Sequence, residues 1–185
     1  MSAHRTVVAA AAGLLALAAC SQQDQGDEPA AATSGTAIGT VAATVGALND
    51  HRKLAAALTD TQLAPVLDGK GDYTLLAPSD AAFDALGDKG AALASTDQRP
   101  LMIAVLRGHV LPGQVTPQGI EAAITRKRGP VEMRTMSGST VRFAKNANGG
   151  LTVSNGAQTA AMAAGSTTAS NGAVLPIDKV LLPAQ

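Results

Sequence analysis

The sequence predicts an α+β domain over residues 41–185, with helices in its first part and strands in its last third. Leu48, Leu54 and Leu58 recur at the spacing of a helix that buries one side. From residue 131 the pattern changes to strict alternation of apolar and polar residues, as in half-buried strands. Asn148-Gly149 lies between two such runs and is typical of a tight hairpin turn. Helices followed by a strand meander indicate an α+β architecture.

The leucine pattern predicts two short helices, about 40–48 and 51–59, separated by Asn49-Asp50. His51 is expected to be partly buried on a helix face. One further helical turn is expected over 63–67, closed by Gly69. A short apolar strand follows over 73–77 and ends at Pro78. Ser79 is a suitable N-cap for a helix over 80–86, which Gly87 closes.

A longer helix should begin after Thr96 or Asp97, because Pro100 is well tolerated in a first helical turn. We expect its buried stripe to contain Leu101, Val105 and Leu106. An extended segment over 109–111 should lead from it to the turn Pro112-Gly113. Thr116-Pro117 then predicts a cap and the start of a helix reaching about residue 124.

The last third should supply the strands of the domain. Alternation is clear over 131–136, 141–143 and 151–153, and it is weaker over 157–163, where alanines dominate. The closing strand is expected within 173–182.

The N-terminus predicts export. Residues 1–19 combine a short basic start with an apolar run from Val7 to Ala19, which is shorter than the ~20 residues of a membrane-spanning helix. This is the pattern of a signal peptide. The run ends in Leu17-Ala18-Ala19-Cys20, which resembles the bacterial lipobox, and that resemblance implies cleavage before Cys20 and a lipid on its sulfur. An ordinary signal peptide with an incidental cysteine is the alternative.

Residues 20–40 are predicted to be the lipidated cysteine and a disordered tether. The segment from Ser21 to Thr40 holds almost no large apolar residue before Ile38, so it cannot bury enough surface to offset chain entropy. Ser21 directly after Cys20 resembles the sorting pattern of outer-membrane lipoproteins in Gram-negative bacteria. We therefore expect an outer-membrane protein that is anchored through lipid and faces the periplasm or the cell surface.

The amino-acid composition argues against several classes of function. The chain has 14 basic and 14 acidic residues, and loss of Arg5 with the signal peptide leaves a net charge near −1. This balance argues against a nucleic-acid partner. Cys20 is the only cysteine, so neither a disulfide framework nor a thiol metal site is expected. The absence of Trp and the presence of only one Tyr and two Phe count against a sugar-stacking platform.

Three segments together resemble the signatures of the fasciclin (FAS1) family. They are Tyr73-Thr74-Leu75-Leu76-Ala77-Pro78-Ser79-Asp80-Ala81-Ala82-Phe83, then Leu106-Arg107-Gly108-His109-Val110-Leu111-Pro112-Gly113, then Asn171-Gly172-Ala173-Val174-Leu175-Pro176-Ile177-Asp178-Lys179-Val180-Leu181-Leu182-Pro183. The resemblance implies a wedge-shaped β-sandwich with several short helices packed around it. It also implies adhesion or protein–protein binding at a cell surface, without enzymatic activity.

The chain departs from the family pattern at three places. Leu76 replaces a Phe in the first segment, Gly108 replaces the Tyr before the central His, and Leu175 replaces the His of the closing segment. Because the Tyr-His region is the reported adhesion motif of animal members, an integrin-type contact is not carried over to His109.

His109 is the first candidate site residue. We expect it to hydrogen-bond a polar group of the first segment, such as Asp80 or Thr74, in a structural role, and a binding surface formed by these three residues is the alternative. A Ser79–Asp80–His109 hydrolase would need an acyl-transfer motif that the chain lacks. Its histidines and acidic residues match no metal-binding spacing, and no cofactor is indicated. Arg126-Lys127-Arg128 is either a solvated loop or a contact for an acidic surface polymer.

These observations favour a lipid-anchored envelope protein whose domain binds a protein or a cell surface, without catalysis. The alternative is a carrier of a small apolar ligand such as a lipid or pigment, with methionines softening the wall of its pocket. The methionines in question are Met102, Met133, Met136 and Met162. The other interpretation, which we favour, is that they fill the core.

Overall fold

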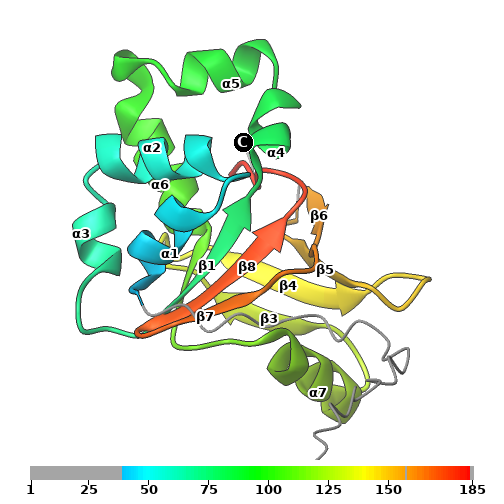
Figure 1. Cartoon of the computed structure of the whole chain (residues 1–185). Helices are drawn as coiled ribbons and strands as arrows, with labels where there is room; N and C mark the ends of the chain where they lie inside the picture. Colours follow the sequence, from blue (N-terminus) through cyan, green and yellow to red (C-terminus); the bar gives the residue numbers. More distant parts are fainter. Residues whose placement is uncertain (1–38, 157, 184–185) are drawn as a thin grey trace, which may run out of the picture. The chain divides into compact units, whose positions relative to one another are not determined.

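Two four-stranded sheets form the centre of the fold over residues 39–156 and 158–183, which the computed structural model describes (Figure 1). The predicted signal peptide, Cys20 and nearly all of the tether lie outside these residues. One sheet has the strand order β2-β1-β8-β7 and the other has the order β3-β4-β5-β6. Helices cover the face of the first sheet that the second sheet leaves free.

The first sheet joins the two ends of the domain. Its central strands β1 (Tyr73–Pro78) and β8 (Gly172–Ile177) are parallel, with Thr74 opposite Ala173. The outer strands β2 (Val110–Pro112) and β7 (Thr167–Ala169) are antiparallel to them. The two central strands therefore place segments that are about 100 residues apart in sequence next to each other.

Alternate residues of β1 and β8 enter different hydrophobic clusters. Leu75 and Val174 pack with the helices, whereas Leu76 and Leu175 pack against the second sheet. Successive strand residues point to opposite faces, so a strand that is buried on both faces must be apolar throughout. This explains the continuous apolar runs of both strands.

The second sheet is the meander that the alternating pattern predicts. Its strands are β3 (Val131–Arg134), β4 (Thr140–Lys145), β5 (Leu151–Ser154) and β6 (Thr159–Ala161), all antiparallel. Val141, Phe143 and Val153 face the first sheet. The helix α7 (Pro117–Lys127) adds Ile120 to the same cluster, and Thr116 caps it as predicted.

Six helices contribute to the helical side. They are α1 (Val41–Ala47), α2 (Arg52–Asp60), α3 (Ala64–Leu67), α4 (Asp80–Asp84), α5 (Asp88–Leu93) and α6 (Arg99–Gly108) within the described residues. Thr40 and Ser79 cap α1 and α4 through their hydroxyls, and the cap at Ser79 confirms the prediction. These caps satisfy backbone N–H groups that have no partner within a helix.

Several details differ from the sequence predictions. Helix α5 and strand β7 were not predicted, and Leu101 is 43% exposed while Met102 takes the buried position on α6. Thr96 and Asp97 do not cap α6 but form a 3₁₀ turn (Thr96–Gln98) before it. The helix predicted over 80–86 ends at Asp84, and the closing strand ends at Ile177.

Candidate functional site

Thr74 of the first signature lies in the middle of β1 and is fully buried. Its hydroxyl donates to the carbonyl oxygen of Gly113 at 2.7 Å and accepts from the backbone N–H of Val115 at 2.7 Å. Both partners belong to the loop between β2 and α7. Thr74 therefore fixes this loop to the sheet, and its hydroxyl has no open side for a binding partner.

Asp80 connects two helices. Its carboxylate accepts a hydrogen bond from the backbone N–H of Lys53 at 2.8 Å, at the N-terminal turn of α2. Its own backbone N–H donates to the carbonyl of Asp50 at 2.7 Å. A carboxylate at this end of a helix satisfies an unpaired donor and complements the helix dipole. His51 occupies the N-cap position of α2 without a capping side-chain bond and is buried, so Asp80 supplies the cap from another segment.

His109 is buried at the C-terminal end of α6, with 1% of its surface exposed. The backbone N–H of Leu181 donates to Nε2 at 2.9 Å, and Nδ1 lies 2.8 Å from the carbonyl oxygen of Val105. Since an N–H faces Nε2 and a carbonyl faces Nδ1, the proton is on Nδ1. Burial lowers the pKa of His109 from 6.5 to about 4, against the opposite effect of the bond to Val105, so the ring is neutral near pH 7.

The predicted side-chain bond from His109 to Asp80 or Thr74 is therefore wrong. The ring turns back toward its own helix and meets the closing segment instead. The hydrogen bond of His109 to the first signature is made by its backbone, where its carbonyl accepts from the N–H of Leu76 at 2.8 Å. The three candidate residues do not form one surface site, because each is occupied by a different structural contact.

The closing signature begins with a buried junction. Asn171 accepts from the N–H of Val41 at 2.8 Å and donates to the carbonyls of Leu67 and Gly69 at 2.7 and 2.9 Å. Gly172 follows with a φ of 149°, and a Cβ there would overlap the carbonyl oxygen of Tyr73. Gly172 is thus required for the close approach of β8 to β1, and Asn171 attaches the start of β8 to the ends of α1 and α3.

Catalytic and metal arrangements are not seen in the described residues. The Ser79 hydroxyl accepts from the N–H of Ala82, and both ring nitrogens of His109 are engaged, so the two form no nucleophile–base pair. Among residues 39–156 and 158–183 there is no group of three or more His, Cys, Asp or Glu side chains that could hold a metal ion. No helix in this part of the chain is long and apolar enough to cross a membrane.

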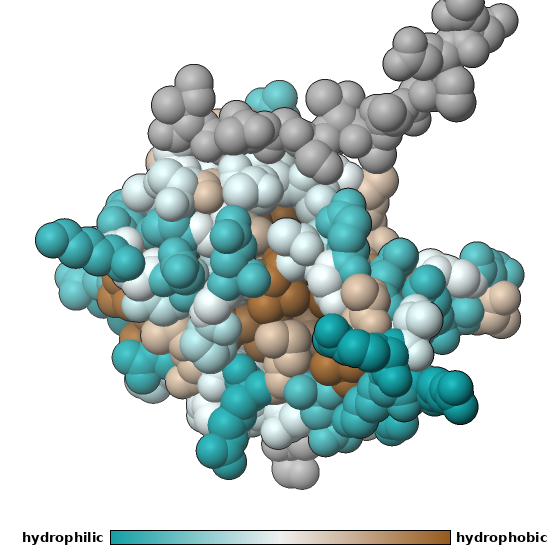
Figure 2. Space-filling model, turned by 90° about the horizontal axis from the view of Figure 1, so that it is seen from below, coloured by the Kyte–Doolittle hydropathy of each residue, from teal (hydrophilic) through white to brown (hydrophobic). Residues whose placement is uncertain are grey.

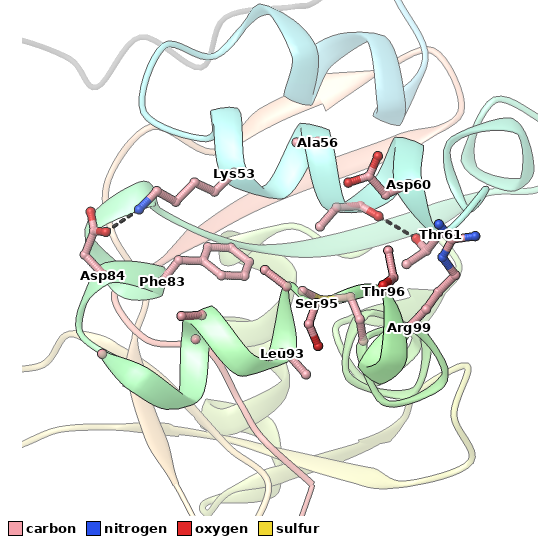
Figure 3. A pocket seen from close by; sticks show the side chains of 16 residues that line it. Lys53, Ala56, Asp60, Thr61, Phe83, Asp84, Leu93, Ser95, Thr96 and Arg99 are labelled. Atoms are coloured by element: carbon pink, nitrogen blue, oxygen red, sulfur yellow. Dashed lines mark hydrogen bonds and ion pairs between the residues drawn. The ribbon is translucent and has the colours of Figure 1, made fainter.

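A cavity of about 640 Å³ lies between α2 on one side and α4, α5 and the start of α6 on the other (Figure 3). Phe83, Leu93 and Met102 provide apolar walls. Small residues face each other across it, namely Ala56, Ala57, Gly87, Gly90, Ala91 and Ala94. The space exists because these side chains are too short to fill the gap between the helices.

Charged groups mark the two ends of this cavity. Lys53 forms an ion pair with Asp84 at one end, and Asp60, Thr61 and Arg99 lie at the other (Figure 3). Sequence reasoning did not find this site, because alanine and glycine carry no recognisable pattern and α5 was not predicted. Of the four methionines considered, only Met102 lines the cavity; Met133 and Met162 pack against the other cluster, and Met136 is 38% exposed.

Residues 49–183, about three quarters of the chain, match the model of the Fasciclin domain family. The chain belongs to the fasciclin domain family. The fasciclin domain here also resembles the FAS1 domain pair from the insect cell adhesion molecule fasciclin I, with a TM-score of 0.58 and 20% identity. That similarity covers 70% of this chain and 44% of the insect chain, and it confirms the predicted fold class, an α+β sandwich with short helices packed around it.

Two bacterial proteins are similar to this chain in sequence. Protein sll1483 of Synechocystis is 28% identical over 131 residues, which is 70% of this chain and 66% of that protein. The cell surface glycolipoprotein MPB83 of Mycobacterium bovis is 32% identical over 124 residues, which is 67% of this chain and 49% of the relative. The chain thus spans between about half and two thirds of the length of these relatives.

The basic run of the fasciclin domain lies at the end of α7. Arg126 and Lys127 occupy the last turn, and Arg128 ends the helix in a left-handed conformation with a φ of 53°. Basic side chains at this end complement the helix dipole. All three are exposed. Helix α7 lies at the bottom of Figure 1, and Figure 2 shows the molecule from below. On this face strongly hydrophilic residues surround a smaller apolar area.

Proposed function

We propose that this chain is an exported lipoprotein of the cell envelope whose fasciclin domain binds a protein or a cell-surface partner. The observation that carries the proposal is the combination of the lipobox-like run ending at Cys20 with a domain of the fasciclin family. A relative whose printed name is cell surface glycolipoprotein supports it. In this proposal the lipid on Cys20 holds the protein to the outer membrane, and the segment between Cys20 and the cap of α1 at Thr40 is a flexible spacer.

The domain acts by binding and not by catalysis in this proposal. The residues that sequence reasoning offers for chemistry, Ser79, Asp80 and His109, each satisfy a backbone group of the fold. A group that already caps a helix or pairs with a buried N–H is poorly placed to activate a nucleophile. We therefore place recognition of the partner on exposed side chains of the domain.

The exposed basic run at the end of α7 is the surface that we propose for recognition of an acidic partner. Residues 117–154 contain six basic and two acidic residues, and Glu121 is already paired with Lys145 at 3.8 Å. Residues 41–112 contain six basic and eight acidic residues, so positive charge is concentrated on the α7–β5 part of the domain. Such a concentration attracts acidic surfaces and speeds their association, although salt screens it.

Two experiments test the two parts of the proposal. Metabolic labelling with palmitate should label the wild-type chain and not a Cys20→Ala variant, and membrane fractionation should find wild type in the outer membrane. Labelling that persists in Cys20→Ala would contradict the anchor at Cys20. An inner-membrane location of wild type would contradict the proposed sorting to the outer membrane.

Crosslinking on intact cells should recover a specific partner with wild type. Simultaneous substitution of Arg126, Lys127 and Arg128 by Gln should reduce that recovery. The matched control substitutes Lys70, Lys89 and Arg107 by Gln, which removes the same charge from other exposed positions. Equal recovery with both triple variants would rule out the basic run as the recognition surface.

A further inference from the structure

We propose that the cavity between α2 and α5 is a binding site for a small amphipathic anion, with an apolar body against Phe83 and a negatively charged head near Arg99. This site goes beyond recognition of a macromolecule, and it does not depend on the basic run or on any protein partner. A cavity of about 640 Å³ is within the range of roughly 300–1,000 Å³ that is usual for small-molecule sites.

The middle of the cavity suits an apolar body. Phe83 is half-buried and presents its ring to the open space (Figure 3), and Leu93 and Met102, which also line the cavity, are buried. Apolar surface that stays in contact with water is unfavourable by about 25 cal/mol per Å², so a ligand that covers it gains free energy. The deformable side chain of Met102 can adapt to ligands of different shape.

The two ends of the cavity differ in their electrostatics. At one end the ammonium of Lys53 is already neutralised by the carboxylate of Asp84. At the other end the guanidinium of Arg99 has no carboxylate within 4.0 Å among the described residues, although Asp60 lines the same end. A planar guanidinium with free donors is well suited to a carboxylate, a sulfate or a phosphate. An anionic head is therefore expected at the Arg99 end.

The hydroxyls of Thr61 and Ser95 supply no free donor for such a head. Thr61 and Ser95 already donate to the carbonyl oxygens of Ala57 and Ala92, at 2.6 and 2.7 Å. Thr96 also lines this end of the cavity and is exposed. Arg99 is thus the main attraction for an anionic head, and the carboxylate of Asp60 at the same end opposes it.

The test compares three probes with the same twelve-carbon chain and different heads. Calorimetric titration of the full chain is carried out with dodecanoate, dodecanol and dodecyltrimethylammonium, each below the concentration at which it forms micelles. We expect saturable binding that is tightest for dodecanoate and weakest for the cation. Equal or tighter binding of dodecanol or of the cation would overturn the assignment of the anionic head.

Matched variants locate the site. Ala91 lines the cavity, whereas Ala92, the next residue of α5, does not. Ala91→Trp should abolish dodecanoate binding, and Ala92→Trp should leave it unchanged. If Ala91→Trp does not fold, Ala56→Trp fills the same space from α2. Binding that survives in a folded cavity-filling variant, or that is lost equally in Ala92→Trp, would overturn the site.

The Arg99→Gln variant tests how much the anionic head contributes to binding, separately from the apolar body. Arg99 is exposed, so its contribution is that of a solvent-screened ion pair, and we expect dodecanoate to bind about three- to five-fold more weakly. Binding of dodecanol should not change. Arg107→Gln on the same helix is the control, because Arg107 is exposed and does not line the cavity. An equal loss for Arg107→Gln, or no loss for Arg99→Gln, would overturn the role of Arg99.

Discussion

The backbone N–H of Leu181 donates a hydrogen bond to Nε2 of His109 across 2.9 Å, and this bond joins two family signatures inside the fold. His109 ends the helix α6, and Leu181 follows the last strand of the domain. The imidazole thus spans two segments that are 72 residues apart in sequence. Its buried position makes the central His of this chain a structural residue.

His109→Ala should destabilise the domain by about 2–4 kcal/mol. The substitution removes a fully buried side chain and leaves the N–H of Leu181 without a partner, and the two losses add. Urea unfolding followed by circular dichroism measures the change. Arg107→Ala, two residues earlier and exposed, should change stability by less than about 0.5 kcal/mol. Equal stability of the His109→Ala variant and wild type would show that the bond to Leu181 contributes nothing.

Most helices and strands could be predicted from the sequence. The strands β1 and β8, for example, have continuous apolar runs because they are covered on both faces. It does not predict α5, because Asp88 to Leu93 contain a glycine and a single large apolar residue and so show no helical stripe. Contacts between residues that are distant in sequence could not be predicted from the sequence either. The partner of His109 is a backbone N–H, and a backbone donor leaves no trace in the identity of residue 181. The cavity could not be predicted for a similar reason, because it exists where alanine and glycine leave space between helices.

Acid should destabilise the domain through His109. Its pKa is about 4 in the folded protein and near 6.5 when unfolded, so the unfolded state binds more protons between these values. Stability contributed by the neutral ring is therefore complete above pH 6.5 and falls as the pH decreases toward 4. The shift corresponds to about 3 kcal/mol at most.

The measurement is the free energy of unfolding between pH 7 and pH 4 for wild type and His109→Gln. All other titratable groups are the same in both proteins, so the difference between the two curves isolates the histidine. We expect wild type to lose more stability than the variant over this range. Parallel curves would contradict a buried neutral His109.

Gly172→Ala should prevent folding or destabilise the domain severely. A Cβ at residue 172 would overlap the carbonyl of Tyr73, and the φ of 149° is unfavourable for other residues. Because the overlap is with the backbone of a central strand, no side chain can move to relieve it. Gly46→Ala is the matched control, since a Cβ there meets nothing within 4 Å.

In contrast to Gly172→Ala, Gly46→Ala should raise stability by roughly 0.5–1 kcal/mol, because alanine is favoured over glycine within a helix. Thermal unfolding distinguishes the two variants. A folded Gly172→Ala domain with an unchanged melting temperature would show that β1 and β8 can separate without loss of stability.

Thr74→Val should destabilise the domain although it hardly changes the volume of the side chain. Valine keeps the shape but cannot donate to Gly113 or accept from Val115, so a partly buried carbonyl and a partly buried N–H lose their partner. Each unsatisfied group costs about 1–3 kcal/mol, partly offset where water can reach the loop. Thr74→Ser keeps both hydrogen bonds and removes one methyl group, which should cost about 1 kcal/mol. Hydrogen exchange should therefore show faster opening of the loop at residues 113–115 in Thr74→Val than in Thr74→Ser, and the opposite order would mean that packing of the methyl group, not the hydroxyl, holds this loop to the sheet.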